Sequence, residues 1–241
     1  MQISRLVSQR TDLSTFLVHL TRAENDDTGR IRLEGIIESG RIEARTAYGH
    51  ARQKVEGIVD AEKSQRVVCF TETPLEHVHL LVQQIDGREF QFEPYGIAIS
   101  KRIARTAGVN PVWYVDMTPG HQWLTNPIDN LINTAIERGD FENSDIAKLA
   151  PFIEQMGTWP GRPRKEFWWE REWRARGDFK LPSRFIGICP SGEQKELAAT
   201  VKSAGRQAVW IDAQWGLEEI IGRLAGFTAD EVSVFTDMAE C

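Results

Sequence analysis

The sequence predicts one α+β domain. Its short β-prone runs and its helical stretches follow one another without the regular alternation that a doubly wound parallel sheet requires. No repeat, low-complexity tract or Pro/Gly/Ser-rich linker divides the 241 residues, and 41% of them are hydrophobic, which is ordinary for a globular protein with a sizeable core. We therefore expect a single domain over residues 1–241, with an acidic helical region at about 207–241.

Local signals predict the elements of the first third of the chain. The apolar run FLVHL at 16–20 favours a strand, as does RVVCF at 66–70. RIRLEGIIESGRI at 30–42 predicts a helix that ends at Gly40, because glycine readily adopts the left-handed conformation of a C-cap. Pro74 suits the first position of a further helix, since its missing N–H costs nothing there.

Apolar periodicity predicts the elements of the rest of the chain, after a charged turn at 84–93. The expected strands are 95–100, 112–115, 185–189 and 208–211, and the expected helices are 120–138, 144–156, 192–204 and 213–225. The mixture of clustered strands and helices again favours the α+β class.

The net charge of −6 is unevenly distributed. Residues 207–241 carry seven acids and one base, so this region alone accounts for the whole negative charge and residues 1–206 are neutral overall. A basic cluster stands out in the neutral part, formed by Arg162, Arg164, Lys165, Arg171, Arg174 and Arg176. Such a cluster binds phosphate groups despite an acidic total, or forms a solvated surface of ion pairs, and the charge pattern leaves both readings open.

Composition argues against membrane, secretory and metal-binding classes. No stretch approaches the ~18 apolar residues of a membrane-spanning helix, and the N-terminus lacks the apolar core of a secretory signal. Cys69, Cys189 and Cys241 are scattered, which suits a protein of the reducing cytoplasm. His77 and His79 are two positions apart, so they diverge on a helix, and we expect no metal site.

Residues 167–176, FWWEREWRAR, are predicted to form a strand. At a period of two, one face is apolar in all but one position and the other is charged in all but one position. A strand would direct Glu170 and Glu172 to the same face, with their Cα atoms roughly 7 Å apart. Two adjacent carboxylates can divide acid–base work in catalysis. The alternative is a charged outer face with cross-strand ion pairs, and this segment alone does not separate the two.

Two further motifs precede this segment in the chain. HLTR at 19–22 ends the first strand, and VCFTETPLEH at 68–77 runs from a strand into a polar turn. With WEREWR at 169–174, their order resembles the ADP-ribosyltransferase superfamily, in particular the DarT nucleic-acid-modifying toxins and the uncharacterised DUF2971 group. Together with EPYGIA at 93–98, the motifs also resemble AbiGi, a family from abortive phage resistance described as an antitoxin.

The resemblance to ADP-ribosyltransferases implies a fold with a split, mixed or antiparallel β core and flanking helices. It also implies an NAD cleft in which the late glutamate, here Glu172, holds a ribose hydroxyl and faces the positive charge that develops as the nicotinamide–ribose bond breaks. Glu170 would contact the nucleophile of the acceptor. Phe70, standing where related enzymes carry a tyrosine, would stack on nicotinamide.

The remaining NAD contacts implied by the resemblance come from the first third of the chain. His19 would bind the adenosine ribose, with Thr21 and Arg22 near a ribose or the phosphates. Arg41 or Arg45 would meet the pyrophosphate, which arginine binds well through paired N–H groups. The sequence has no Gly-rich strand-to-helix fingerprint, so NAD would not bind as it does in a Rossmann fold.

These observations predict an NAD-dependent ADP-ribosyltransferase that modifies a macromolecule, with nucleic acid preferred over protein as the acceptor. The alternative is a non-catalytic AbiGi-like antitoxin that acts in phage defence by binding a partner toxin. A simple NAD glycohydrolase is a third reading, distinguished by the release of free ADP-ribose.

Overall fold

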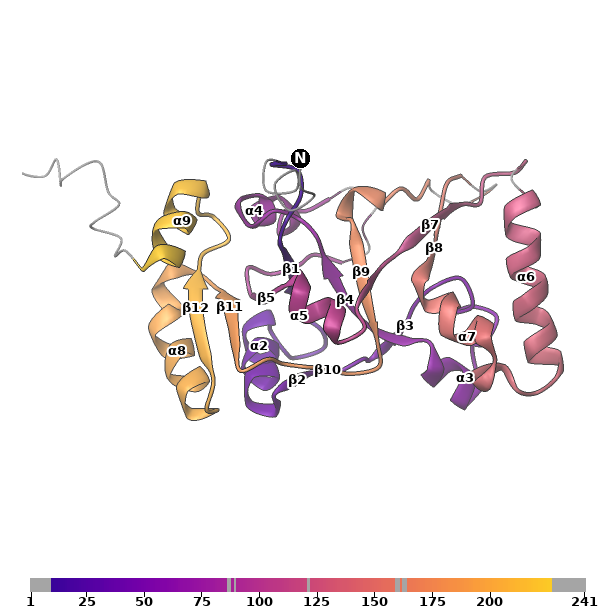
Figure 1. Ribbon diagram of the computed structural model, residues 1–241, viewed down its shortest axis with the longest axis horizontal. Helices are drawn as coiled ribbons and strands as arrows, with labels where there is room; N and C mark the ends of the chain where they lie inside the picture. Colours follow the sequence, from indigo (N-terminus) through magenta and orange to yellow (C-terminus); the bar gives the residue numbers. More distant parts are fainter. Residues whose placement is uncertain are drawn as a thin grey trace, which may run out of the picture.

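The computed structural model describes residues 10–85, 88, 90–120, 122–158, 161 and 164–226. It confirms the α+β class, with a mixed eight-stranded sheet and helices on its faces (Figure 1). The strands are β1 (Phe16–Leu20), β2 (Arg41–Ile42), β3 (Thr46–Ala47), β4 (Arg66–Thr71), β5 (Gly96–Ser100), β6 (Asn110–Pro111), β7 (Trp113–Asp116), β8 (Ile153–Met156), β9 (Glu172–Arg176), β10 (Phe179–Lys180), β11 (Arg184–Ile188) and β12 (Gln207–Ile211).

The helices agree with most of the predicted segments. The α-helices are α2 (Gly29–Ser39), α3 (Val59–Ser64), α4 (Val78–Leu81), α5 (Lys101–Thr106), α6 (Gln122–Glu137), α7 (Asp145–Leu149), α8 (Gln194–Ser203) and α9 (Leu217–Ala225). Short 3-10 turns are η1 (Leu75–His77), η2 (Phe141–Asn143), η3 (Ala150–Phe152), η4 (Trp168–Glu170) and η5 (Ser191–Glu193). As predicted, α2 ends at Gly40, whose φ of 70° is left-handed. Of the acidic region at 207–241, the structure describes 207–226, and the remainder lies outside the described residues.

The predicted helix over 144–156 is wrong in its second half. Helix α7 ends at Leu149, and Ile153–Met156 form β8, which pairs in parallel with β7. Pro151 lies between them, and its lack of an N–H together with its ring prevents an α-helix from continuing.

The order of strands in the main sheet is β12-β11-β5-β1-β4-β9-β6, with β3 paired to β4 outside this path. Strand β1 pairs with β5 over five positions, but it is joined to β4 through the single registered pair Val18↔Thr71. Strands β4 and β9 pair over five positions, from Val67↔Arg176 to Thr71↔Glu172. The sheet is therefore weakly joined between β1 and β4, at the position where two of the sequence motifs meet.

Alternating side chains along the strands build separate cores on the two faces of the sheet. Leu17 and Phe70 belong to one core, which α2 and α8 help to form, and Val18 belongs to the other, which includes side chains of η1, α4 and α9. A third core joins β7 and β8 to α6 and α7 at the opposite end of the molecule from β12 (Figure 1). Along the described residues, no helix combines the length and apolar character needed to cross a membrane.

Candidate functional site at the ends of β4 and β9

The three sequence motifs lie on neighbouring strands. HLTR begins in β1, CFTET ends β4, and the EWR part of WEREWR begins β9. The rings of His19 and Phe70 have centroids 5.8 Å apart, and Thr71 is the registered partner of Glu172. Chain topology therefore brings together segments that are separated by about 50 to 150 residues in the sequence.

Phe70 and Glu172 project from opposite faces of the sheet. Phe70 is the partner of Trp173, and the next pair along the ladder is Thr71↔Glu172. Directly paired residues share a face and successive pairs alternate, so the two side chains point in opposite directions. Phe70 is only 2% exposed and lies within a hydrophobic core. In this structure, Phe70 and Glu172 do not line one common pocket.

His19 and Thr21 make contacts within the fold. The Nδ1–H of His19 donates to the carbonyl oxygen of Cys69 at 2.8 Å, across the weakly paired junction of β1 and β4. Burial lowers the pKa of His19, which favours the neutral imidazole. The hydroxyl of Thr21 donates to the carbonyl oxygen of Gly29 at 2.8 Å and so ties the end of β1 to the start of α2.

The three arginines expected to bind NAD face carboxylates of this chain. Arg22 lies 3.8 Å from Glu24, and its guanidinium stacks over the ring of Phe90 at 4.1 Å from the centroid. Arg41 and Arg45 both pair with Glu43, and both are largely exposed.

An open cavity of about 610 Å³ lies beside Phe90. Ala23 and Glu93 also line it, so it adjoins the end of the HLTR motif. Its size falls in the range of small-molecule sites. The described residues that line it include neither His19 nor Glu172, so the cavity is separate from the strand positions where the resemblance places catalysis.

Glu172 belongs to a buried ion-pair network centred on Arg174, which is 1% exposed. The Nε and Nη2 of Arg174 donate to the two carboxylate oxygens of Glu172 at 2.9 and 2.8 Å. Arg174 also donates to Glu154 and to the carbonyl oxygen of Pro151. Lys165 pairs with Glu154 as well. Both oxygens of the candidate catalytic carboxylate are therefore already bound by a structural cation.

Mutual attraction favours the charged forms of Glu154 and Arg174 although both side chains are buried. Burial alone would raise the pKa of Glu154, but Arg174 and Lys165 hold it below its ordinary value. Burial works against the charge on Arg174 too, yet Glu172 and Glu154 raise its pKa above the usual range. A guanidinium shared between two carboxylates in this way satisfies charges that would be costly to bury alone.

The prediction that Glu170 and Glu172 lie on one strand face is wrong. Residues Trp168–Glu170 form the turn η4, and Arg171 has a left-handed backbone with φ of 49°. A strand cannot pass through such a residue, so β9 begins only at Glu172. The carboxylate of Glu170 instead binds Arg88 at 2.6 Å, and burial raises its pKa in spite of that cation.

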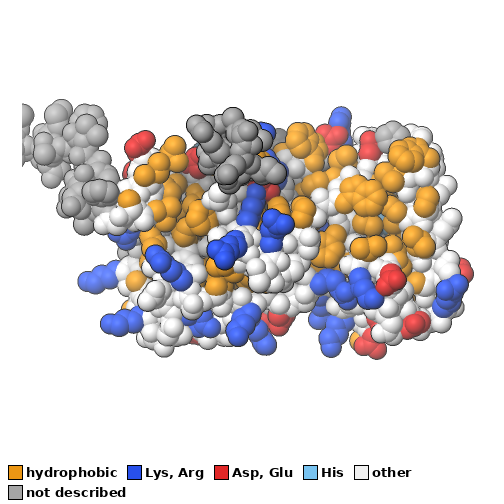
Figure 2. All heavy atoms as spheres, viewed as in Figure 1, with side chains coloured by type: hydrophobic (Ala, Val, Ile, Leu, Met, Phe, Trp, Pro, Cys, Tyr) orange, Lys and Arg blue, Asp and Glu red, His pale blue; other side chains and the backbone are white. Residues whose placement is uncertain are grey.

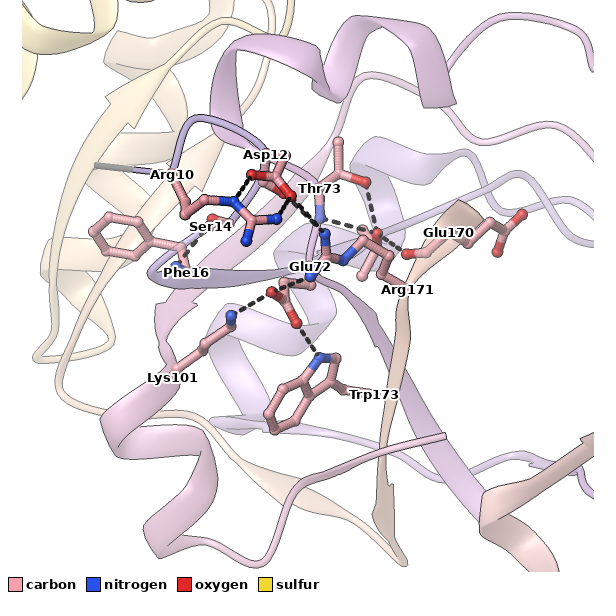
Figure 3. A network of polar contacts seen from close by, with 11 residues as sticks. Arg10, Asp12, Ser14, Phe16, Glu72, Thr73, Lys101, Glu170, Arg171 and Trp173 are labelled. Atoms are coloured by element: carbon pink, nitrogen blue, oxygen red, sulfur yellow. Dashed lines mark hydrogen bonds and ion pairs between the residues drawn. The ribbon is translucent and has the colours of Figure 1, made fainter. Parts of the chain in front are cut away.

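Glu72 is the centre of a second polar network, on the other side of β9 (Figure 3). Its carboxylate, 8% exposed, accepts bonds from Arg171 at 2.9 Å, Lys101 at 2.6 Å and the Nε1–H of Trp173 at 2.8 Å. Figure 3 shows Glu170 pointing away from Glu72, toward the opposite side of the turn. The backbone N–H of Glu72 also donates to the carbonyl oxygen of Arg171 at 3.2 Å, which extends the pairing of β4 with the chain before β9.

Sequence reasoning missed these roles of Glu72, Arg174 and Glu154. The motifs CFTET and WEREWR contain the first two, but the networks depend on which strands become neighbours. Glu154 falls within a predicted helix, and no local signal points to its partner 20 positions later in the chain. Within the described residues, no group of three His, Cys, Asp or Glu side chains is arranged to hold a metal ion.

Comparison with known proteins gives one family. A family model described as "Putative abortive phage resistance protein AbiGi, antitoxin" matches residues 36–189, well over half of the chain. The matched range contains CFTET and WEREWR, and hence both polar networks, while HLTR lies before it. No curated protein and no solved structure matched the chain.

Proposed function

Because the chain belongs to the AbiGi family of abortive phage resistance proteins, we propose that it acts in phage defence as an antitoxin that binds a partner toxin. The observation that carries this proposal is that the residues which an NAD site would require are buried in the core or bonded to other groups of this chain. Phe70 is buried in the core, His19 bonds to Cys69, and both oxygens of Glu172 bind Arg174. Such an arrangement supports a binding scaffold better than a site awaiting a substrate.

The test uses the full-length chain and the protein encoded by the neighbouring gene. Co-expression of the chain should relieve growth arrest caused by that protein, and calorimetry with the two purified proteins should show a stable complex. NAD titrated into the chain should give no heat of binding. Absence of both rescue and complex would overturn the proposal.

A second candidate function is ADP-ribosyl transfer from NAD to a macromolecule. The specific observation that favours it is the placement of β1, β4 and β9 side by side, with a junction of one residue pair between β1 and β4. Opening of that junction would release His19 from Cys69 and let a ligand reach the strand ends. Glu172 would also have to free one carboxylate oxygen from Arg174.

Labelled NAD incubated with the chain and with cellular RNA, DNA and protein tests this second function. Transfer of label that is lost in Glu172→Gln would establish it. The glutamine keeps a hydrogen-bond acceptor for Arg174, so that a thermal melt can separate loss of catalysis from loss of folding. Label that appears as free ADP-ribose would indicate a glycohydrolase, and no reaction with any acceptor would reject the enzyme.

A further inference from the structure

The two edges of the main sheet are protected to different degrees. At one edge, β6 is only two residues long and contains Pro111. Short length and proline both hinder the addition of another strand, because proline lacks the N–H that a ladder needs. At the other edge, β12 (Figure 1) has five residues, QAVWI, with no proline and no charged side chain. Strand β12 is therefore the edge that lacks the usual protection against a further strand.

Hydrogen bonds to the β11 side show which backbone groups of β12 face outward. The N–H of Gln207 and the carbonyl oxygen of Ile211 both bond to residues that flank β11, at 2.9 and 3.1 Å. Backbone groups of successive residues in a strand point to alternate sides, so Ala208 and Trp210 face away from β11. Within the part of the chain that the structure describes, the N–H and C=O of Ala208 and the N–H of Trp210 have no hydrogen-bond partner. These unpaired groups are the ones that an added strand would bind.

The remaining outward group, the carbonyl oxygen of Trp210, is covered by a side chain. Arg223 of α9 donates to it through Nε at 3.2 Å and to Gln194 of α8 through Nη2 at 3.3 Å. Both distances lie at the long end of the range for N–H···O bonds, so both bonds are weak. A backbone N–H that approaches Trp210 can therefore replace the arginine at this oxygen.

A second copy of this chain supplies the matching backbone groups. If two β12 strands run antiparallel about a twofold axis at Val209, Ala208 of each copy lies opposite Trp210 of the other. Residues that face each other in this way exchange both of their N–H···O=C bonds, so all the outward groups of both copies become paired. The same axis places Arg206 opposite Asp212, so unlike charges meet at each end of the new ladder. The edge of β12 is thus complementary to itself, as a twofold interface requires.

Twofold axes at the neighbouring outward positions do not pair these groups. An axis at Ala208 would set Trp210 against Arg206, whose N–H already bonds within the chain at 3.0 Å. An axis at Trp210 would set Ala208 against Asp212, whose carbonyl oxygen already accepts a bond at 3.1 Å. The hydrogen-bond pattern therefore selects the axis at Val209.

The surface around β12 suits recognition through the backbone. On the face drawn in Figure 2, hydrophobic side chains gather over the part where Figure 1 labels β7 and β8, while Lys and Arg side chains are prominent at the end with α8 and β12. Strand addition to a sheet edge obtains its affinity from main-chain hydrogen bonds and needs no broad apolar patch.

We propose that this chain forms a twofold dimer in which the β12 strands of two copies pair antiparallel about Val209. The two eight-stranded sheets then continue into each other, and Arg223 leaves the carbonyl oxygen of Trp210 as the strands pair. The inference concerns the chain alone, so it stands or falls independently of the proposed antitoxin function.

Sedimentation of the purified full-length chain tests the dimer, and Ala208→Pro tests its hydrogen bonds. Wild type should sediment as a dimer at about 100 µM. Proline at position 208 removes an outward N–H from each copy and no bond to β11, so the dissociation constant should rise at least about tenfold. Ala208→Ser keeps the N–H and is the matched control, which should sediment as wild type does. A monomeric wild type, or equal dimerisation of the two variants, would overturn the inference.

Opposite charges at position 209 test the register with variants that keep every backbone N–H. Val209 is half-buried, and the proposed axis brings the two side chains at this position together. Val209→Lys and Val209→Glu should each be monomeric, because like charges then oppose each other across the axis. An equimolar mixture of the two variants should restore a dimer that contains one of each. Dimerisation of either variant alone, or none in the mixture, would show that the axis does not lie at Val209 and that the proposal is wrong.

Discussion

The turn at Trp168–Glu170 and the strand at Glu172–Arg176 are separated only by Arg171, whose φ is 49°. In the turn, Trp168 is 56% exposed, whereas in the strand Arg174 is 1% exposed. The usual distribution of apolar and charged side chains is thus reversed within a few residues. The comparison indicates that Arg174 is used within the fold, where it binds Glu172 and Glu154, whereas Trp168 of the preceding turn faces solvent.

Arg174→Met should have the largest effect on stability. The substitution preserves much of the side-chain volume but leaves Glu172 and Glu154 buried without their shared cation. Breaking a buried ion pair by removal of one partner costs about 3–5 kcal/mol, and we expect a loss of that order in the free energy of unfolding, measured by urea denaturation.

Arg176→Met is the matched control for this experiment. Arg176 lies two residues later on the same strand and is exposed, so its replacement should change stability by no more than about 0.5 kcal/mol. If both substitutions lower the free energy of unfolding by the same amount, the buried ion pairs of Arg174 stabilise the protein no more than an exposed arginine does. The buried network would then not be what stabilises the strand.

The stability contributed by Glu154 in the Arg174 network and that contributed by Glu170 in the turn should change with pH in opposite directions. Glu154, in the Arg174 network, has a lowered pKa in the folded state, so its ionised form stabilises the protein above the unfolded pKa and this stability is lost as pH falls through the folded pKa. Glu170, in the turn, has a raised pKa, so stability from this group falls as pH rises through the folded pKa.

Glu154→Gln and Glu170→Gln, each unfolded by urea at pH 7 and at pH 4, measure this difference. The deficit of Glu154→Gln relative to wild type should shrink at pH 4. Its deficit at pH 7 should be smaller than that of Arg174→Met, because Arg174 keeps Glu172 as a partner. For Glu170→Gln, the stability relative to wild type should be higher at pH 7 than at pH 4. The same direction of change in both variants would contradict the assigned pKa shifts.

Most of the secondary structure could be predicted because its signals are local. The signals for the strand at 16–20 and for the C-cap at Gly40 each lie within one element. The strand–helix–strand pattern of β11, α8 and β12 likewise follows from signals inside each of its elements. The failure over 144–156 has a local and a non-local part. Pro151 ends the helix, and residues 153–156 then form β8 because β7, about 40 residues earlier in the chain, offers a parallel partner.

The motifs that build the candidate site were visible in the sequence, but their geometry and the roles of Glu72, Arg174 and Glu154 were not. The order of HLTR, CFTET and WEREWR indicated neighbouring strands, and the structure places them on β1, β4 and β9. Period-two alternation could not reveal the left-handed Arg171, because arginine has no intrinsic preference for that conformation. Contacts from Glu72 hold it there, and these exist only after β4 and β9 have paired.

Thr71→Val should have the smallest effect and should act on the turn alone. Valine matches the shape of threonine but lacks the hydroxyl that donates to Glu170 and lies 2.8 Å from the hydroxyl of Thr73. Loss of such a hydrogen bond costs about 1 kcal/mol, and the turn should become looser while the Arg174 network stays intact. Quenching of tryptophan fluorescence by acrylamide should rise, with little change in the pH dependence contributed by Glu154.

Thr71→Ser separates the hydroxyl from the methyl group in this experiment. Serine keeps the donor, so its quenching should match that of wild type even if its stability falls slightly from the lost methyl. If serine and valine increase quenching equally, the hydrogen bond to Glu170 does not hold the turn. The turn that carries the exposed tryptophans would then be held by two contacts, Arg88 with Glu170 and Arg171 with Glu72.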